Sequence, residues 1–236
     1  MEERNPDRIA VIAHRGGSDL FQENSLRAFK ESERLGVDAV ECDVHLTRDK
    51  KLVVMHDSNL SRTTGVDKRV SDFSMEELRE IKLLNGDRIP TLEDVFDEVS
   101  INVIIELKSP ETMAALLSLF KSNPTFIKRC GLISFFHDAI MLVRKQIPEI
   151  QTGALLAGFP VDPVSVAKSC GADILSLNFE GLTTNYVDRC HLGKIKVAVW
   201  TPNTEEEIEA AIKAEVDFIA SDRPDIVIKK IKEIRQ

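Results

Sequence analysis

The feature that most constrains the fold is the regular alternation of short apolar runs with helix-like stretches along the whole chain. Most of these runs are rich in Val, Ile, Leu or Ala with little polar alternation, which is typical of strands buried on both faces of a parallel sheet. Eight strand–helix units in 236 residues match the number and size of a TIM (β/α)8 barrel. The strand-like runs begin near Ile9, Ala39, Asn102, Cys130, Gln151, Ile174, Lys196 and Val216.

The main alternative is an open, doubly wound parallel sheet, which needs a topological switch and usually has fewer strands. No Gly-x-Gly-x-x-Gly loop supports a dinucleotide site, because Gly16-Gly17 alone is a weak signal. No linker or low-complexity tract divides the sequence. We therefore predict a single barrel domain over residues 1–236.

Capping signals indicate where helices begin. Ser25 follows Asn24 and precedes a helix that we expect to end at Gly36. Further starts are predicted at the capping box Thr91-Leu-Glu-Asp94, at Ser109-Pro110-Glu111, at Thr204-Glu-Glu-Glu207 and at Asp225.

A polar segment at about 57–90 interrupts this rhythm after the second strand. Long connections inside compact domains are usually functional or partly structured. We interpret this one as a small insertion at the barrel mouth, with one short helix after Ser74.

Charge and cysteine content exclude several classes of protein. The formal net charge of -8 disfavours a nucleic-acid surface. The charged start has no apolar signal region, and no run approaches the ~20 apolar residues of a transmembrane segment. The four cysteines form no Cys-x-x-Cys pair, which favours a structural role and a reducing, cytoplasmic setting. Cys42 and Cys130 lie in apolar runs, so we expect their thiols to be buried.

Ionisable side chains stand where several apolar runs stop. His14 follows the first run, and Glu41 and Asp43 lie in the second. His56 and Glu106 come near the ends of two later runs. An unpaired charge in a core is costly, so such groups are expected in buried strands mainly where they converge on a site. Because the carboxyl ends of barrel strands face one mouth, we expect these five side chains to meet there.

Strand spacing predicts which of these groups share a face. Residues two apart point the same way, so Glu41 and Asp43 point together, as do Glu106 and Lys108. Three carboxylates without a thiolate pair favour a hard divalent metal, Mg²⁺ or Ca²⁺.

The remaining groups suit an anionic substrate. His14 and His56 can exchange protons near neutral pH. Arg15 and Lys108 supply positive charge, and the guanidinium offers a two-pronged contact for phosphate.

An ordered series of short motifs spans nearly the whole chain and resembles the glycerophosphodiester phosphodiesterase family. Each motif alone is weak, but the ordered set is highly specific. The motifs are His14-Arg15-Gly16, Glu23-Asn24-Ser25, Glu41-Cys-Asp43-Val-His45, His56-Asp57, Arg62-Thr-Thr-Gly65, Glu106-Leu-Lys108, Ser134-Phe135, Val199-Trp200-Thr201 and Ser221-Asp222-Arg223-Pro224.

The resemblance implies a metal-dependent TIM barrel that cleaves glycerophosphodiesters into glycerol 3-phosphate and an alcohol. It implies that Glu41, Asp43 and Glu106 bind the metal. It also implies that His14 and His56 are the general acid and base, without saying which is which. The implied substrate-binding residues are Arg15 and Lys108 at the phosphate, Asn24 close to the phosphate or metal, Trp200 against the glycerol and Phe135 in the same pocket.

Other functions would require residues that differ from this set. A lysophospholipase D or phospholipase-like enzyme would favour aromatic residues at the mouth, and the insertion offers only Phe73. A non-catalytic barrel would be expected to lack one of the five ionisable residues, and none is missing. An isomerase or aldolase would need a Schiff-base lysine or a different metal set.

For Asp222-Arg223-Pro224 we expect an ion pair or a helix cap. The sequence leaves open whether water or a glycerol hydroxyl attacks, and gives no oligomeric state.

Overall fold

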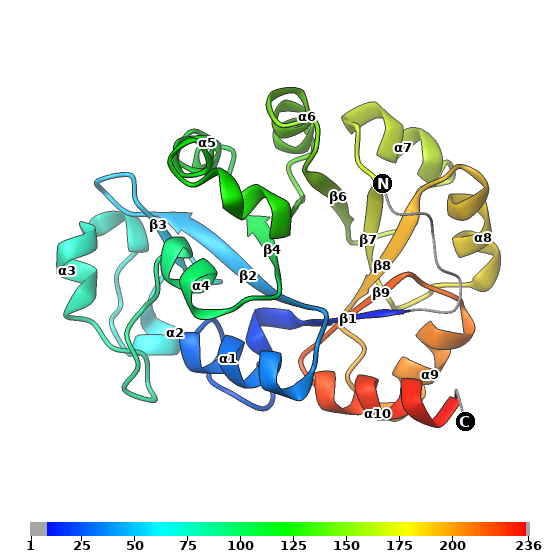
Figure 1. The fold of residues 1–236 in the computed structure, drawn as a ribbon, viewed down its shortest axis with the longest axis horizontal. Coiled ribbons are helices and arrows are strands. Elements are labelled where there is room, and N and C mark those ends of the chain that lie inside the picture. Colours follow the sequence, from blue (N-terminus) through cyan, green and yellow to red (C-terminus); the bar gives the residue numbers. More distant parts are fainter. Residues whose placement is uncertain (1–8, 235–236) are drawn as a thin grey trace.

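Parallel strands close into a barrel at the centre of the molecule, as the computed structural model of residues 9–234 shows (Figure 1). Each barrel strand pairs in parallel with its neighbours, and β1 pairs with both β2 and β9, which closes the ring. The predicted TIM barrel is confirmed, and the doubly wound alternative is wrong. The barrel strands are β1 (Ala10–Ala13), β2 (Ala39–Leu46), β4 (Asn102–Leu107), β5 (Cys130–Ser134), β6 (Gln151–Leu156), β7 (Ile174–Asn178), β8 (Lys196–Trp200) and β9 (Phe218–Ser221).

One further strand, β3 (Leu52–Val54), lies outside the ring and was not among the eight predicted strands. It pairs antiparallel with the second half of β2, with Val44 opposite Val54. Just beyond β3, the backbone N–H of Met55 donates to the carbonyl of Asp43 over 3.0 Å. The hairpin therefore returns the chain to the barrel mouth immediately before His56.

Helices surround the strands (Figure 1). Ser25 caps the first of them, and Thr91 and Thr204 begin capping boxes as predicted. The helix expected from Ser109 begins later, at Thr112, because the carbonyls of Ser109 and Pro110 accept three-residue turn bonds instead. The helices are α1 (Leu26–Leu35), α4 (Leu92–Glu98), α5 (Thr112–Ser122), α6 (His137–Gln146), α7 (Pro163–Cys170), α8 (Thr184–Leu192), α9 (Glu205–Lys213) and α10 (Pro224–Ile234), with the 3-10 turns η1 (His14–Gly16) and η3 (Pro124–Arg129).

The insertion lies to one side of the barrel, beyond β3 (Figure 1). It contains α2 (Ser61–Thr64), η2 (Val70–Asp72) and α3 (Met75–Arg79), and Ser74 caps α3 as predicted. A separate apolar cluster holds it together and anchors it on the hairpin. The buried members of this cluster are Val53, Met55, Leu60, Val70, Met75, Leu78, Leu83 and Ile89.

The structure also bears on the predictions for the cysteines and for membrane-spanning segments. The four thiols are free and buried, which confirms the prediction for Cys42 and Cys130. Within residues 9–234, none of the helices combines the length and the apolar character that crossing a bilayer requires.

Candidate active site

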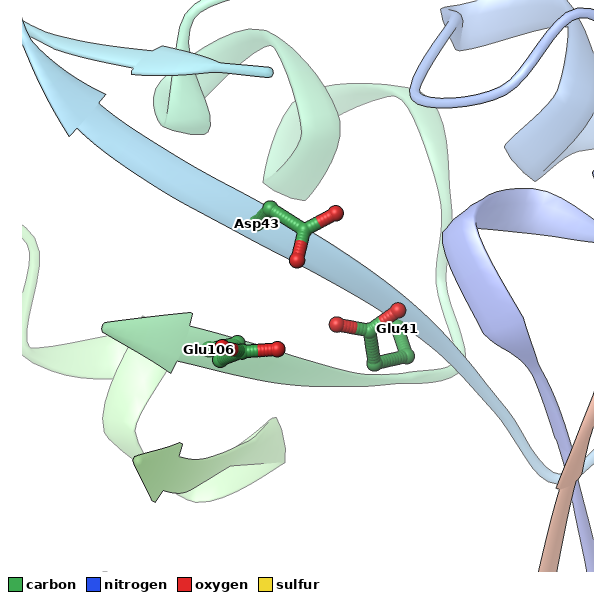
Figure 2. A group of neighbouring side chains, drawn as sticks. All are labelled: Glu41, Asp43 and Glu106. Carbon is green, nitrogen blue, oxygen red and sulfur yellow. The ribbon is translucent and has the colours of Figure 1, made fainter. Parts of the chain in front are cut away.

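Three buried carboxylates meet inside the mouth of the barrel (Figure 2). Glu41 and Asp43 project from the same face of β2, and Glu106 projects from the neighbouring strand β4. Asp43 and Glu106 are register partners on these two strands. One carboxylate oxygen from each residue lies within 4.8 Å of the others. Only 2%, 0% and 8% of Glu41, Asp43 and Glu106 are exposed, so the cluster concentrates negative charge away from water.

The charge state of this cluster depends on nearby cations. Burial and the charge of Asp43 raise the pKa of Glu41 to about 8. Burial also raises the pKa of Glu106, against the pull of Lys108. Burial opposes ionisation of Asp43 as well, but Lys108 and Arg15 outweigh it and lower the pKa of Asp43 to about 2. Burial therefore disfavours the ionised forms of Glu41 and Glu106, and added positive charge at the cluster would favour them.

The donor set fits a hard divalent cation. It consists of oxygens only, which is the chemistry that Mg²⁺ and Ca²⁺ prefer. Within the described part of the chain, Glu41 Oε1 is buried and accepts no hydrogen bond. A buried acceptor without a partner is costly, so this oxygen points to a ligand.

Lys108 lies directly against the cluster. Its Nζ is 2.9 Å from Asp43 Oδ1 and 2.7 Å from Glu106 Oε1. Burial disfavours the ammonium charge, but these two carboxylates overcome that effect and raise the pKa of Lys108. The predicted same-face arrangement of Glu106 and Lys108 is therefore observed. The ammonium group of Lys108 lies against the cluster of three carboxylates.

A chain reversal after β1 brings Arg15 to the same cluster. Arg15 has a left-handed backbone (φ 49°), and Gly16 follows with φ 80°. A Cβ at Gly16 would lie 2.8 Å from the Cβ of Ala28, so only glycine fits. The Arg15 N–H donates to Glu41 Oε2 over 2.9 Å, and Arg15 Nε lies 3.5 Å from Asp43 Oδ2.

Asn24 completes this reversal. It too has a left-handed backbone (φ 55°), and its N–H donates to the carbonyl of Arg15 over 2.9 Å. Its buried side-chain amide donates to Asp43 Oδ2 over 2.8 Å. Asn24 therefore lies against Asp43, one of the three buried carboxylates.

His14 stands at the end of β1 with a carboxylate partner on each side. Its Nδ1 is 2.6 Å from Asp222 Oδ1, and its Nε2 is 4.0 Å from Glu41 Oε2. Burial would lower the pKa of His14, but the bond to Asp222 and the charge of Glu41 more than offset it and raise the pKa. Asp222 is itself held by the Asn203 side chain over 2.8 Å and by the hydroxyl of Ser18.

Sequence reasoning did not pair Asp222 with His14, although it expected an ion pair or a cap there. β9 pairs with β1 so that Ser221 lies opposite Ala13. The next residues along both strands, Asp222 and His14, therefore come together. The available signal was a carboxylate just after the eighth strand of a closed barrel, next to the first strand.

His56 reaches the mouth from the hairpin rather than from a barrel strand. Its Nδ1 is 2.7 Å from Asp57 Oδ1, and its carbonyl oxygen lies 2.9 Å from the ring Nε2 of His45. Burial lowers the pKa of His56, and the charge of Asp43 and the hydrogen bond to Asp57 only partly oppose this effect. Each of the two predicted histidines thus has a carboxylate on Nδ1, which leaves Nε2 for other contacts.

A cavity of about 180 Å³ joins these groups. Phe135 and Trp200 form one wall as an edge-to-face pair, with ring centroids 5.9 Å apart. The indole N–H of Trp200 is buried and has no hydrogen-bond acceptor within the described residues. The cavity is lined by His14, Arg15, Glu41, His56, Glu106, Lys108, Ile133, Phe135, Leu155, Ser176, Trp200, Thr201 and Ala220.

Comparison with known proteins gives a consistent result. The model of the glycerophosphoryl diester phosphodiesterase family matches residues 14–226. A glycerophosphodiester phosphodiesterase of Caldanaerobacter subterraneus subsp. tengcongensis is 34% identical over 241 residues, which covers 96% of this chain and 99% of that protein.

Solved structures agree in fold. The glycerophosphodiester phosphodiesterase of Thermotoga maritima has a TM-score of 0.81 at 29% identity, covering 94% of this chain and 98% of that one. A phosphodiesterase from Oleispira antarctica, in complex with the product sn-glycerol 3-phosphate, has a TM-score of 0.86 at 26% identity. That match covers 94% of this chain and 96% of the other.

Proposed function

This chain belongs to the glycerophosphoryl diester phosphodiesterase family, and we propose that it releases glycerol 3-phosphate by acid–base catalysis with a bound divalent cation. Its similarity to members of that family identifies the chain as a glycerophosphodiester phosphodiesterase. One observation carries the proposal for the site. A single cavity is lined by two clustered carboxylates, two cationic side chains and two histidines that each have a carboxylate partner, and the third carboxylate, Asp43, lies within 4.8 Å of the other two.

The metal site in this proposal consists of Glu41, Asp43 and Glu106, and the ion is Mg²⁺ or Ca²⁺. A divalent cation bound there would neutralise charge on the phosphodiester and polarise its phosphoryl group. The unpartnered oxygen of Glu41 and the raised pKa of that residue support this assignment.

Arg15 and Lys108 bind the phosphate in this proposal. A phosphodiester anion repels nucleophiles, so fixed positive charge at the oxygens stabilises the transition state. Both side chains already lie against the carboxylates that would hold the ion. Asn24 contributes indirectly, because its amide holds Asp43 in place.

His14 and His56 move the protons. One imidazole accepts the proton of the attacking oxygen, which belongs to water or to the neighbouring glycerol hydroxyl. Attack by the hydroxyl forms a cyclic phosphate, and water must then open it to give glycerol phosphate. The other donates a proton to the leaving alkoxide as its bond to phosphorus breaks. Nδ1 of each ring faces Asp222 or Asp57, so Nε2 is the nitrogen available in both.

Trp200 and Phe135 receive the glycerol in this proposal. The flat indole face suits the carbon skeleton, and the unpartnered indole N–H can donate to a glycerol hydroxyl.

The test is a side-by-side assay of glycerophosphocholine, glycerophosphoglycerol and a lysophospholipid, each with Mg²⁺, Ca²⁺, Mn²⁺ or chelator. We expect release of glycerol 3-phosphate from the first two substrates, and loss of that release in chelator. Turnover of the lysophospholipid alone would instead favour a lysophospholipase D, and no turnover of any of the three would contradict the proposal.

A further inference from the structure

Arg62 in the insertion contacts two carboxylates that come from different parts of the chain. Its Nη1 and Nη2 lie 2.5 and 2.7 Å from the two carboxylate oxygens of Glu23. Its Nε lies 2.6 Å from Asp57 Oδ2. Glu23 belongs to the loop after β1, whereas Asp57 follows the β2–β3 hairpin. One guanidinium therefore joins the two segments that flank the cavity.

Each carboxylate has a second partner inside the site. The other oxygen of Asp57 is 2.7 Å from Nδ1 of His56. Glu23 Oε1 is 3.6 Å from Nη1 of Arg15. Contacts thus run from the histidine to the phosphate-binding arginine without interruption, and Arg62 is the central member.

The contact geometry requires an arginine. A planar guanidinium presents several N–H groups in fixed directions, so it can hold two carboxylates at once, whereas an ammonium is a point charge. The side chain of Glu23 is only 11% exposed, which limits the alternatives open to its carboxylate. The bond to Arg62 also lowers the pKa of Asp57 to about 2, so Asp57 is an anion across the neutral range.

The insertion supplies a firm base for Arg62. Leu60, just before α2, is buried in the apolar cluster of the insertion. Thr63 is buried as well, and its hydroxyl lies 3.1 Å from the sulfur of Met55. The helix that carries Arg62 is therefore fixed to the same hairpin that carries His56.

We propose that Arg62 is a positioning residue that orients His56 through Asp57 and Arg15 through Glu23. In this way the insertion ties the proton-transfer group to the phosphate-binding group. The inference rests on the proposed function of the same site, and it assigns no direct contact between Arg62 and the substrate.

The first test compares Arg62→Gln and Arg62→Lys with the wild type. We expect Arg62→Gln to lower kcat by about 10- to 100-fold, the scale that misplaced catalytic groups produce, and also to raise KM. Arg62→Lys keeps the positive charge but cannot contact both carboxylates as the planar guanidinium does. Its kcat/KM should therefore lie between those of the wild type and Arg62→Gln. Arg144→Gln is the matched control, because Arg144 forms a fork with Asp173 far from the mouth. The control should lose stability while kcat and KM stay within about twofold.

Double variants separate the two contacts. In an Asp57→Asn background, Arg62→Gln should still raise KM, but its effect on kcat should be much smaller than in the wild type. In a Glu23→Gln background, it should still lower kcat but leave KM unchanged. Equal effects of Arg62→Gln in both backgrounds and in the wild type would overturn the proposal.

The exchange of the His56 ring proton with solvent can be measured without substrate. It therefore tests the positioning role of Arg62 separately from the proposed function. In the wild type, the His56 Nδ1–H held by Asp57 should exchange slowly with solvent in nitrogen-resolved NMR spectra. In Arg62→Gln it should exchange faster, while the spectrum of His14 stays the same. An enzyme inactive on every glycerophosphodiester would contradict the proposed function, but this experiment would still test the positioning role. Unchanged exchange together with unchanged kcat and KM would reduce Arg62 to a surface ion pair and overturn the inference.

Discussion

Replacement of Asp222 by Asn tests whether a half-buried carboxylate prepares His14 for proton transfer. Asn has nearly the same shape, and Asn203 and Ser18 remain to hold it. The variant removes one negative charge at 2.6 Å from Nδ1 of His14. It also allows a carbonyl or an amide group to face the ring, so the tautomer of the imidazole is no longer fixed.

The size of the effect follows from that hydrogen bond. A hydrogen bond to a charged group contributes about 1.5–3 kcal/mol. Since about 1.4 kcal/mol corresponds to a tenfold change in rate, we expect kcat of Asp222→Asn to fall about 10- to 150-fold. KM should change less, because Asp222 is not among the residues that line the cavity.

The pH profile gives a second, independent readout. Asp222 is one cause of the raised pKa of His14, so its removal lowers that pKa. The limb of the kcat profile that belongs to His14 should therefore move to lower pH, whether His14 donates or accepts the proton. The assay is release of glycerol 3-phosphate from glycerophosphocholine at saturating divalent metal, from about pH 5 to well above the ordinary His pKa of about 6.5, because the pKa of His14 is raised.

Stability should respond with a defined sign. His14 and Asn203 hold the pKa of Asp222 well below its usual value, despite the opposing effect of burial. The stabilisation is therefore present above the unfolded pKa of an aspartate, about 3.9, and is lost as the pH falls through the folded value. Asp222→Asn should lower the urea midpoint at neutral pH. The difference between the urea midpoints at neutral and at strongly acid pH should therefore be smaller in the variant than in the wild type.

Asp225→Asn is the matched control on the same segment. Asp225 accepts two hydrogen bonds from the partly buried guanidinium of Arg223 and does not line the cavity. Its replacement should leave kcat and both limbs of the profile in place. The reasoning is refuted if Asp222→Asn keeps kcat within about twofold of the wild type, since the bond should be worth at least tenfold.

Three further predictions address other parts of the site. Glu41→Gln removes one oxygen anion from the carboxylate trio, so calorimetry should detect much weaker binding of Mg²⁺ or Ca²⁺ while the circular dichroism spectrum is kept. Gly16→Ala places a Cβ 2.8 Å from the Cβ of Ala28 at a positive φ. The free energy of unfolding measured in urea should therefore fall by about 1–3 kcal/mol. Trp200→Phe keeps an aromatic wall but removes the unpartnered N–H, so KM for glycerophosphocholine should rise about 10-fold or less, with kcat nearly constant.

Each of these predictions has an outcome that contradicts it. Metal binding of wild-type strength in Glu41→Gln would remove that residue from the metal site. An unchanged urea midpoint in Gly16→Ala would mean that the loop relaxes without cost. A large loss of kcat with unchanged KM in Trp200→Phe would give the indole a part in the chemical step instead of in glycerol binding.

The sequence predicted those features that depend on local periodicity. Apolar runs without polar alternation gave the barrel strands, and spacing by two placed Glu41 with Asp43 and Glu106 with Lys108. These relations hold because side chains alternate along any strand, whatever its partners. Capping residues gave helix starts for the same reason, since a cap acts within three residues.

Other features depend on which strands become neighbours, and the sequence did not reveal them. Asp222 meets His14 only because the barrel closes with β9 beside β1 in one register. His56 arrives from the β2–β3 hairpin, outside the ring of strands. Burial, charge and pairing in the folded state then set the opposite pKa directions of the two histidines. The residue pattern alone indicated an anion, and only the family resemblance pointed to a glycerophosphodiester.

The most direct test of the central claim is the release of glycerol 3-phosphate from glycerophosphocholine by the wild type, His14→Ala and His56→Ala at saturating divalent metal. The account predicts product from the wild type, its loss in chelator and at least about a 100-fold lower kcat in each variant. Near wild-type turnover in both histidine variants, or full activity of the wild type in chelator, would contradict it.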